Sequence, residues 1–407
     1  MKISDIEVLT LRFEYPPNRG FWFAGGYCDA RLSCLVKVHT DAGITGIGSV
    51  YSHPDLVRQI VEGHLRDMLV GEDPRKVETL WEQNYAVTRW YGRKGVAVSA
   101  LGGVDIALWD IRGKVEGKPI YKLLGGDRDR VPAYASALLW KENVAELGDE
   151  AARHLADGFQ AMKMRLGRNF EYDCSALKIV RSVIGQQSRL MIEGNARYSL
   201  EQALRMASEF RSHSIFWLEE PFPPECPDKF RTLRPQAGIP LAAGENEFGV
   251  QGFRELMEIP IVDIVQPDCS RAGGITECSR IGQLAAHHGL QVATHTWSDA
   301  VALAANAHLV ASLPNGLTVE VDRTQNALID ELLVEPLNLV AGQLVLSQAP
   351  GLGIELNEEA VARYTLPKQG SIPDGVYSDM VFGRGSYTPA TAYEQGAQER
   401  LLAEEKA

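Results

Sequence analysis

The sequence contains no run of about 18 consecutive apolar residues, which is the length that a membrane-spanning helix requires. Its first residues lack the apolar segment of an export signal, so we expect the chain to stay in the cytoplasm. Cysteine is sparse, with 6 among 407 residues and no CxxC motif, which excludes a disulfide scaffold and indicates reduced thiols. Basic residues (41) are fewer than acidic ones (53), and the resulting net charge of −12 disfavours nucleic acid or an anionic membrane as a partner.

The composition is otherwise that of a soluble globular protein, and the length favours more than one domain. Residues 1–128 are predicted to form a small α+β domain. Apolar and β-branched residues favour strands at 3–8 and 32–38, and glycines favour a hairpin turn over 41–46. From 54 to 118 the apolar residues mostly recur with the period of helices.

A glycine-rich loop, 16–27, lies between the two predicted strands. Its glycines allow movement, and Arg19 and Trp22 are suited to contact a small molecule. We therefore predict that this loop is a lid and that these two residues help to bind the substrate. A plain surface loop is the alternative.

Residues 129–345 repeat a different unit, in which a short apolar run ends in polar residues and a helical stretch follows. Eight repeats of strand and helix predict a (β/α)8 barrel. An open doubly wound sheet is the alternative, but no GxGxxG motif follows a first strand. We expect the remaining segment, 346–407, to pack back on the first domain and to complete a capping domain. The eight runs are 131–136, 161–165, 190–193, 215–219, 240–245, 264–268, 292–295 and 317–320.

Barrel active sites lie at the carboxyl ends of the strands, so the polar residues there are the informative ones. The third, fourth and fifth runs end in Glu193, Glu219 and Glu245. Three neighbouring carboxylates repel one another, and a hard divalent cation removes that cost. An all-oxygen ligand set favours Mg²⁺. The alternative is that each Glu is a solvated loop residue or a helix N-cap, which three consecutive strand ends in one barrel disfavour.

Further polar residues end the other strands. Lys163 and Arg165 are two apart on one strand and face the same side, where they can bind an anionic substrate or form ion pairs with the carboxylates. His295 and Asp268 end neighbouring strands, which favours a hydrogen-bonded pair that takes and returns a proton. Glu320 ends the eighth strand, where it would bind a substrate oxygen if protonated, or form an ion pair at the rim.

In combination these residues resemble the enolase superfamily, and within it the mandelate racemase group. The resemblance implies a barrel with a capping domain, Mg²⁺ bound by the three glutamates, and removal of the proton beside a substrate carboxylate. It also suggests that Asn195 contacts the substrate. The matching stretches are Ala107–Lys114 with Gly125-Gly126, Lys163–Arg165, Ile192–Asn195, Leu218–Pro221, Gly244–Asn246, Gln266–Asp268 and His295.

Two positions depart from the family pattern. The first metal ligand is usually Asp, and here it is Glu193. The motif of the second strand usually ends in Lys, the base on one face of the substrate, and here it ends in Arg165. Arginine stays protonated and is a poor base. With His295 and Asp268 as the one well-tuned acid–base pair, we predict a dehydratase that converts an aldonate or aldarate into a 2-keto-3-deoxy acid.

Two alternatives remain open. One is a racemase or epimerase that uses Lys163 as a second base. The other is a non-catalytic ligand-binding barrel, for which the acid–base pair would have no purpose, and which would show no Mg²⁺-dependent turnover sensitive to EDTA. We also expect a small carboxylate as substrate and a homo-oligomeric assembly.

Overall fold

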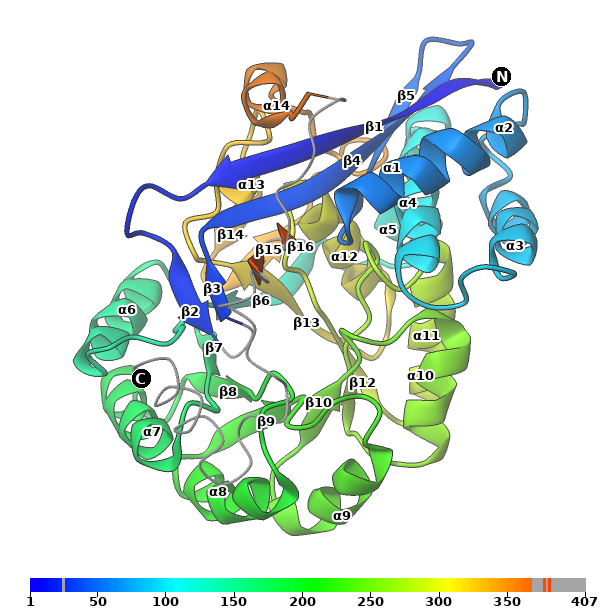
Figure 1. The fold of residues 1–407 in the computed structure, drawn as a ribbon. Helices are drawn as coiled ribbons and strands as arrows, with labels where there is room; N and C mark the ends of the chain where they lie inside the picture. The colour runs from blue at the N-terminus through cyan, green and yellow to red at the C-terminus, as the bar shows by residue number, and fades with distance from the viewer. Residues whose placement is uncertain (24–25, 368–375, 378–379, 382–407) are drawn as a thin grey trace, which may run out of the picture.

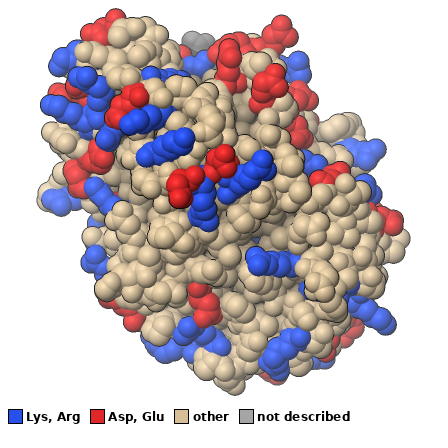
Figure 2. Space-filling model, turned by 180° about the vertical axis from the view of Figure 1, so that it is seen from behind, with Lys and Arg blue, Asp and Glu red and all other residues tan. Residues whose placement is uncertain are grey.

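The computed structural model describes residues 1–23, 26–367, 376–377 and 380–381. The N-terminal part of the chain forms a unit of one sheet and several helices that lies beside a larger barrel (Figure 1). We call this unit the capping unit. On the face that Figure 2 shows, Lys and Arg side chains are interspersed with Asp and Glu. Every helix in the described ranges is too short or too polar to span a membrane.

The sheet of the capping unit is antiparallel, with the order β1-β4-β5. β1 (Ile3–Glu14) pairs with β4 (Ala30–Thr40) from end to end, and a short turn leads from β4 to β5 (Thr45–Val50). Gly43 has a φ of 74°, the left-handed conformation that glycine adopts without strain. The predicted hairpin turn at 41–46 is thus confirmed.

The helices that the periodicity predicts are present, and four of the six helical segments pack on this sheet while the other two pack on α4. Gly46 and Gly48 let α4 lie directly on β5, because a Cβ atom at either position would overlap the backbone oxygen of Ala107 or Gly103. The helical segments are α1 (Pro54–Ile60), the π-helical turn η1 (Val61–Leu65), α2 (Arg66–Leu69), α3 (Val77–Thr88), α4 (Val96–Glu116) and α5 (Ile120–Leu123).

Eight parallel strands follow and close into a barrel, because the last strand pairs with the first. The predicted (β/α)8 fold is therefore confirmed for the described part of the chain. The strands are β6 (Arg130–Ser136), β7 (Ala161–Arg165), β8 (Arg189–Glu193), β9 (Ile215–Glu219), β10 (Leu241–Ala243), β11 (Ile264–Val265), β12 (Gln291–Thr294) and β13 (Gly316–Asp322). The helices are α6 (Ala145–Ala156), α7 (Phe170–Ile184), α8 (Leu200–Ser212), α9 (Pro227–Ala237), α10 (Gly249–Glu258), α11 (Gly274–His287), α12 (Ala300–Ser312) and α13 (Ala327–Asp330).

Three strands end earlier than their apolar runs suggest. Glu245, Asp268 and His295 lie just beyond β10, β11 and β12 rather than inside them. Gly244, at a φ of 135°, turns the chain out of β10 just before Glu245. The loops after the strands therefore carry these side chains, which still lie at the carboxyl end of the barrel.

After β13 and α13 the chain forms a hairpin of β14 (Asn338–Val340) and β15 (Gln343–Val345), which pairs antiparallel with β6. α14 (Glu358–Tyr364) then contacts β1, and β16 (Val376–Tyr377) pairs with β17 (Met380–Val381). We predict that the segment 346–407 packs back on the first domain, but most residues after 367 lie outside the described ranges. Its return to the capping unit and the domain boundaries after 128 and 345 stay predictions.

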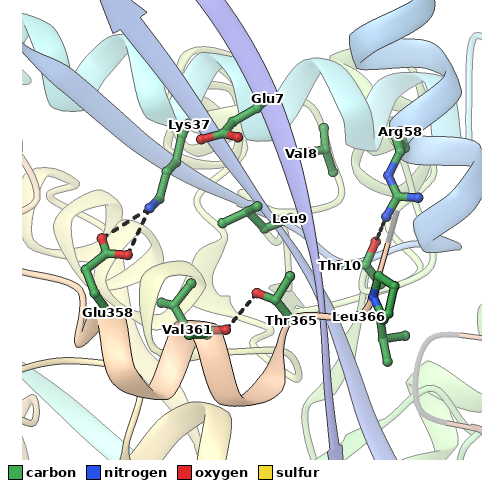
Figure 3. Close-up of a pocket in the computed structure, with 12 residues that line it drawn as sticks. Glu7, Val8, Leu9, Thr10, Lys37, Arg58, Glu358, Val361, Thr365 and Leu366 are labelled. Atoms are coloured by element: carbon green, nitrogen blue, oxygen red, sulfur yellow. Dashed lines mark hydrogen bonds and ion pairs between the residues drawn. The ribbon is translucent and has the colours of Figure 1, made fainter. Parts of the chain in front are cut away.

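A groove of about 520 Å³ lies between β1 and α14 (Figure 3). Lys37 spans it to Glu358, with Nζ and Oε1 3.1 Å apart, and Arg58 donates a hydrogen bond to Thr10 Oγ1 at 2.5 Å. Its lining residues belong to the capping unit and the segment from α14 onward, and none belongs to a barrel strand. The groove is therefore separate from the barrel's strand ends.

A buried carboxylate joins the barrel to the capping sheet. Asp299 precedes α12 and accepts hydrogen bonds from the backbone N–H groups of Val301 and Ala302 at 2.8 and 2.9 Å. It also accepts hydrogen bonds from the hydroxyl groups of Ser33 in β4 and Ser49 in β5. One side chain thus caps a barrel helix and holds two strands of the capping sheet.

Replacing this residue, Asp299→Ala, is expected to lower the free energy of unfolding by about 3 kcal/mol. The change removes a helix cap worth about 1 kcal/mol and leaves two buried hydroxyl groups unsatisfied at about 1 kcal/mol or more each. Urea denaturation measures the difference. The control is Asp228→Ala at the exposed start of α9, which should change stability by less than about 0.5 kcal/mol. Equal stability of the two variants would contradict the role of Asp299.

Candidate functional site

Three carboxylates meet at the carboxyl ends of neighbouring strands. Glu193 ends β8, Glu219 ends β9, and Glu245 follows β10 by two residues. Each offers one oxygen atom, and these atoms all lie within 4.8 Å of one another. Glu193 and Glu219 are fully buried, whereas Glu245 is partly exposed. The structure thus brings together the three predicted metal ligands.

The close approach of these carboxylates has an electrostatic cost. Burial, together with the charge of Glu193, raises the pKa of Glu219 to about 8. Trp217 Nε1 donates to Glu219 Oε2 at 2.9 Å, and the backbone N–H of Asn195 donates to Glu193 Oε1 at 3.0 Å. Neither donor carries a charge. A set of three carboxylate oxygens fits a hard divalent cation such as Mg²⁺, which would stabilise the ionised forms.

Lys163, inside the barrel on β7, lies among carboxylates. Its Nζ is 3.1 Å from Glu193 Oε2 and 3.0 Å from Glu320 Oε1, and it also contacts Glu219 Oε1. Burial by itself lowers the pKa of Lys163, but the charges of Glu219 and Glu320 outweigh it and raise the pKa well above its usual value. Lys163 is therefore a cation enclosed by its partners.

Arg165 has a different environment two residues further along β7. Its Nη1 donates to Ser136 Oγ at 2.7 Å, and its Nη2 is 3.7 Å from Glu320 Oε1. Its guanidinium carbon lies 4.5 Å from the centroid of the Trp297 ring, and that of Arg31 lies 4.4 Å from the same centroid. These contacts hold a planar cation, not a base, at the strand end.

His295 and Asp268 form the predicted hydrogen-bonded pair. The Nδ1 atom of His295 is 2.8 Å from Asp268 Oδ2, so Nδ1 carries the proton that it donates to the carboxylate. The other nitrogen, Nε2, is 3.7 Å from Glu245 Oε2 and thus faces the carboxylate cluster. Burial lowers the pKa of His295, but Glu245 and Asp268 together raise it to about 9. A cation bound at Glu245 would lower the pKa of His295, because it would offset the charge of that carboxylate.

Glu320, on β13, completes the ring of strand ends. Burial raises its pKa, but Lys163, His295 and Arg165 together lower it to about 2. Its Oε2 also accepts a hydrogen bond from the backbone N–H of Thr296 at 3.0 Å. Glu320 is therefore ionised, and its protonated form, which would donate to a substrate oxygen, is disfavoured.

The predicted lid residues are exposed, whereas most site residues at the strand ends are buried. Within the predicted loop, β2 (Phe21–Phe23) and β3 (Gly26–Cys28) pair antiparallel. Arg19 and Trp22 are exposed. Phe21 is the hairpin residue that packs against Trp297, edge to face, with ring centroids 6.2 Å apart. The lid role of residues 16–27, and substrate contacts by Arg19, Trp22 and Asn195, stay predictions.

Sequence reasoning missed three residues close to the acid–base pair. The ring of Tyr51 lies 5.9 Å from that of His295, Trp297 packs on Arg165, and Asn306 donates to Asp268. Trp297 follows β12 by three residues, so its position at a strand end was a usable signal. Asn306 was detectable as a polar residue within the apolar helix α12, although its partner was not.

Comparisons with known proteins agree with this geometry. Residues 10–125 match the model of the N-terminal domain of mandelate racemase and muconate lactonizing enzyme. Residues 146–360 match the enolase C-terminal domain-like model. The chain belongs to the enolase superfamily, in its mandelate racemase group.

Curated relatives of this family member act on sugar acids and their derivatives, according to their names. D-galactarolactone cycloisomerase of Agrobacterium fabrum is 35% identical over 379 residues, which cover 90% of this chain and 100% of that one. Arabinonate dehydratase of Saccharolobus solfataricus is 33% identical and covers 81% of this chain and 89% of its own. A racemase from Streptomyces coelicolor, solved with bound magnesium, superposes with a TM-score of 0.83 at 27% identity over 89% of this chain and all of that one.

The carboxylate cluster generates a prediction about metal binding. Glu219→Gln should weaken Mg²⁺ affinity by at least about tenfold, because it replaces a charged oxygen ligand by a neutral one. Calorimetric titration of Mg²⁺ into the protein measures the change. Glu225→Gln, at an exposed position in the loop after β9, is the matched control and should bind like the unmodified protein. Unchanged affinity in Glu219→Gln would show that the cluster does not hold the metal.

Proposed function

We propose that this protein is a Mg²⁺-dependent dehydratase that converts a sugar acid, an aldonate or aldarate, into a 2-keto-3-deoxy acid. The observation that carries the proposal is the asymmetry of the site. One side holds an imidazole oriented by a carboxylate, with Nε2 facing the cluster. The other side holds Arg165 and the enclosed cation of Lys163.

The substrate's carboxylate would lie against the cluster of Glu193, Glu219 and Glu245. When bound there, Mg²⁺ supplies the positive charge that makes the neighbouring C–H bond more acidic. Arg165 and Lys163 add two further cations on strand β7. Both can stabilise the negative charge that gathers on the carboxylate oxygens when the proton leaves.

The proton would be taken and returned by His295. Its Nε2 accepts the α-proton, and the electrons of the broken C–H bond move into the carboxylate as an enediolate. These electrons then form a double bond between the α and β carbons while the β carbon–oxygen bond breaks. The departing hydroxyl takes the proton from His295 and leaves as water, and the enol becomes the 2-keto acid. Asp268 supports the charged imidazole throughout.

Racemisation is less well supported, because it requires a base on each face of the substrate. Arg165 stands where the family usually places a lysine base, and arginine holds its proton. Lys163 contacts three carboxylates at once, which favours its protonated form. Neither residue is therefore suited to take the α-proton from the second face.

A second candidate is cycloisomerisation of a sugar lactone or anhydro sugar acid. It is favoured by the similarity to D-galactarolactone cycloisomerase, which extends over the whole length of that relative. The same proton is removed, but the departing oxygen belongs to the ring and stays attached to the product. The residues of this site can perform both reactions, and the substrate decides which follows.

Product analysis distinguishes the candidates. The protein with Mg²⁺ is incubated with a set of aldonates, aldarates and their lactones, and products are followed by mass spectrometry and proton NMR. A dehydratase yields 2-keto-3-deoxy acids that are lighter than the substrate by one water. A cycloisomerase yields a ring-opened isomer of unchanged mass from a lactone. Epimers of the substrate would support a racemase, and no turnover of any acid sugar would contradict the proposal.

The mechanism predicts the effect of removing the imidazole. His295→Asn should abolish dehydration, with a loss of at least about 10²–10⁴-fold in kcat, while Mg²⁺ affinity stays unchanged. His288→Asn, at the C-terminal end of α11, is the matched control and should keep full activity. Turnover of the His295 variant at the unmodified rate would exclude His295 as the base.

Isotope exchange in D₂O refines this test. If His295 is the sole base, exchange of the substrate's α-proton should disappear together with dehydration in His295→Asn. Exchange that persists in this variant and is lost on additional Lys163→Met substitution would identify Lys163 as a second base, and would favour the racemase. NMR of recovered substrate measures the exchange.

A further inference from the structure

Every residue of α12 except the last, Ser312, is buried, and almost all its side chains are apolar. Asn306, in its middle, is fully inaccessible to solvent. A buried amide must find partners for its oxygen and its nitrogen, and each missing partner would cost about 1–3 kcal/mol. The partners of Asn306 are located at the ends of two barrel strands, 10 to 38 residues away in the sequence.

The orientation of this amide is determined by its neighbours. The backbone N–H of Cys269 can only donate, and it lies 2.9 Å from Asn306 Oδ1. The oxygen must therefore face Cys269, and the NH₂ group faces the other way. Asn306 Nδ2 lies 3.0 Å from Asp268 Oδ1, 3.1 Å from the backbone oxygen of His295 and 3.1 Å from Thr296 Oγ1.

The two oxygens of Asp268 have separate partners. Oδ2 accepts the hydrogen bond of His295 Nδ1. Oδ1 accepts from Asn306 and from the backbone N–H and hydroxyl of Ser270, at 2.8 and 2.7 Å. Ser270 belongs to the same strand end as Asp268, whereas Asn306 also binds the backbone of His295. Asn306 is thus a bridge between the segment that carries the carboxylate and the segment that carries the imidazole.

We propose that Asn306 is a positioning residue for the acid–base pair. It fixes the plane of the Asp268 carboxylate and its position relative to His295, so that Nε2 is held toward the carboxylate cluster. It does not touch the substrate. This inference rests on the proposed function, because it assigns a task only if His295 transfers the proton.

The test is Asn306→Leu, a change of similar volume that removes both hydrogen-bonding atoms. The expected result is a decrease of about 10–100-fold in kcat and in the rate of α-proton exchange. This is the range typical of residues that orient a metal ligand by hydrogen bonding to it. KM and Mg²⁺ affinity should stay within about threefold, because the carboxylate cluster is intact. Asn84→Leu is the matched control, a buried asparagine of α3 that donates to Leu80 within its own helix. It should keep the unmodified kcat.

A double-mutant cycle separates positioning from a general structural effect. If Asn306 acts through Asp268, adding Asn306→Leu to Asp268→Asn should cause little further loss of kcat. Independent, multiplying losses would overturn the proposal, as would an unmodified kcat in Asn306→Leu. If the leucine variant does not fold, Asn306→Ala takes its place in the cycle with the same expected outcomes.

Comparing His295→Asn with Asn306→Leu distinguishes a failure of the positioning role from a failure of the proposed function. If His295→Asn is inactive while Asn306→Leu is fully active, the positioning role is wrong and the proposed function stands. If His295→Asn turns over at the unmodified rate, His295 is not the base, and the assignment of Asn306 fails together with the proposed mechanism.

Discussion

Repulsion between buried carboxylates is the constraint on which the arrangement of the barrel's carboxyl end depends. Glu193, Glu219 and Glu320 are all inaccessible to solvent, and water cannot screen their charges. The fold compensates with Lys163 between them and Arg165 at the edge. Once Glu245 and Asp268 are counted, five carboxylates face three cations, Lys163, Arg165 and the protonated His295. The remaining negative charge is what makes the site suited to a divalent cation.

The same charge also governs the chemistry of His295. An imidazole between Asp268 and Glu245 holds its proton tightly until positive charge arrives nearby. Under the proposed function, cation binding would therefore be linked to the ability of His295 to accept a proton. The site would become basic only when metal and substrate are in place, and it would not remove protons from other molecules. Under the same proposal, the permanent cation of Arg165 would attract an anionic substrate without adding a base.

Hydrogen bonds along helix α12 connect the capping unit to this site. Its first turn is held by Asp299, which binds the hydroxyl groups of Ser33 and Ser49 in the capping sheet. Asn306 in its middle holds the strand ends of Asp268 and His295, and His308 accepts from the backbone N–H of Tyr121 and lies 3.1 Å from the backbone oxygen of Leu352. Asp299 at the N-terminal cap, and Asn306 and His308 within the helix, thus each connect α12 to a different part of the molecule. Their burial makes these hydrogen bonds hard to replace with water.

Apolar periodicity and side-chain chemistry are local properties, so the eightfold strand–helix repeat and the residue types at the strand ends could be predicted from the amino-acid sequence. Lys163, the three glutamates and the His295–Asp268 pair could be found in this way. It did not reveal that Phe21, and not Trp22, packs on Trp297, since the facing of a three-residue strand depends on its partner. Nor did it reveal that Asn306 joins two strand ends. Such contacts depend on the packing of helices and strands that are distant in the chain, where every buried polar atom must find a partner.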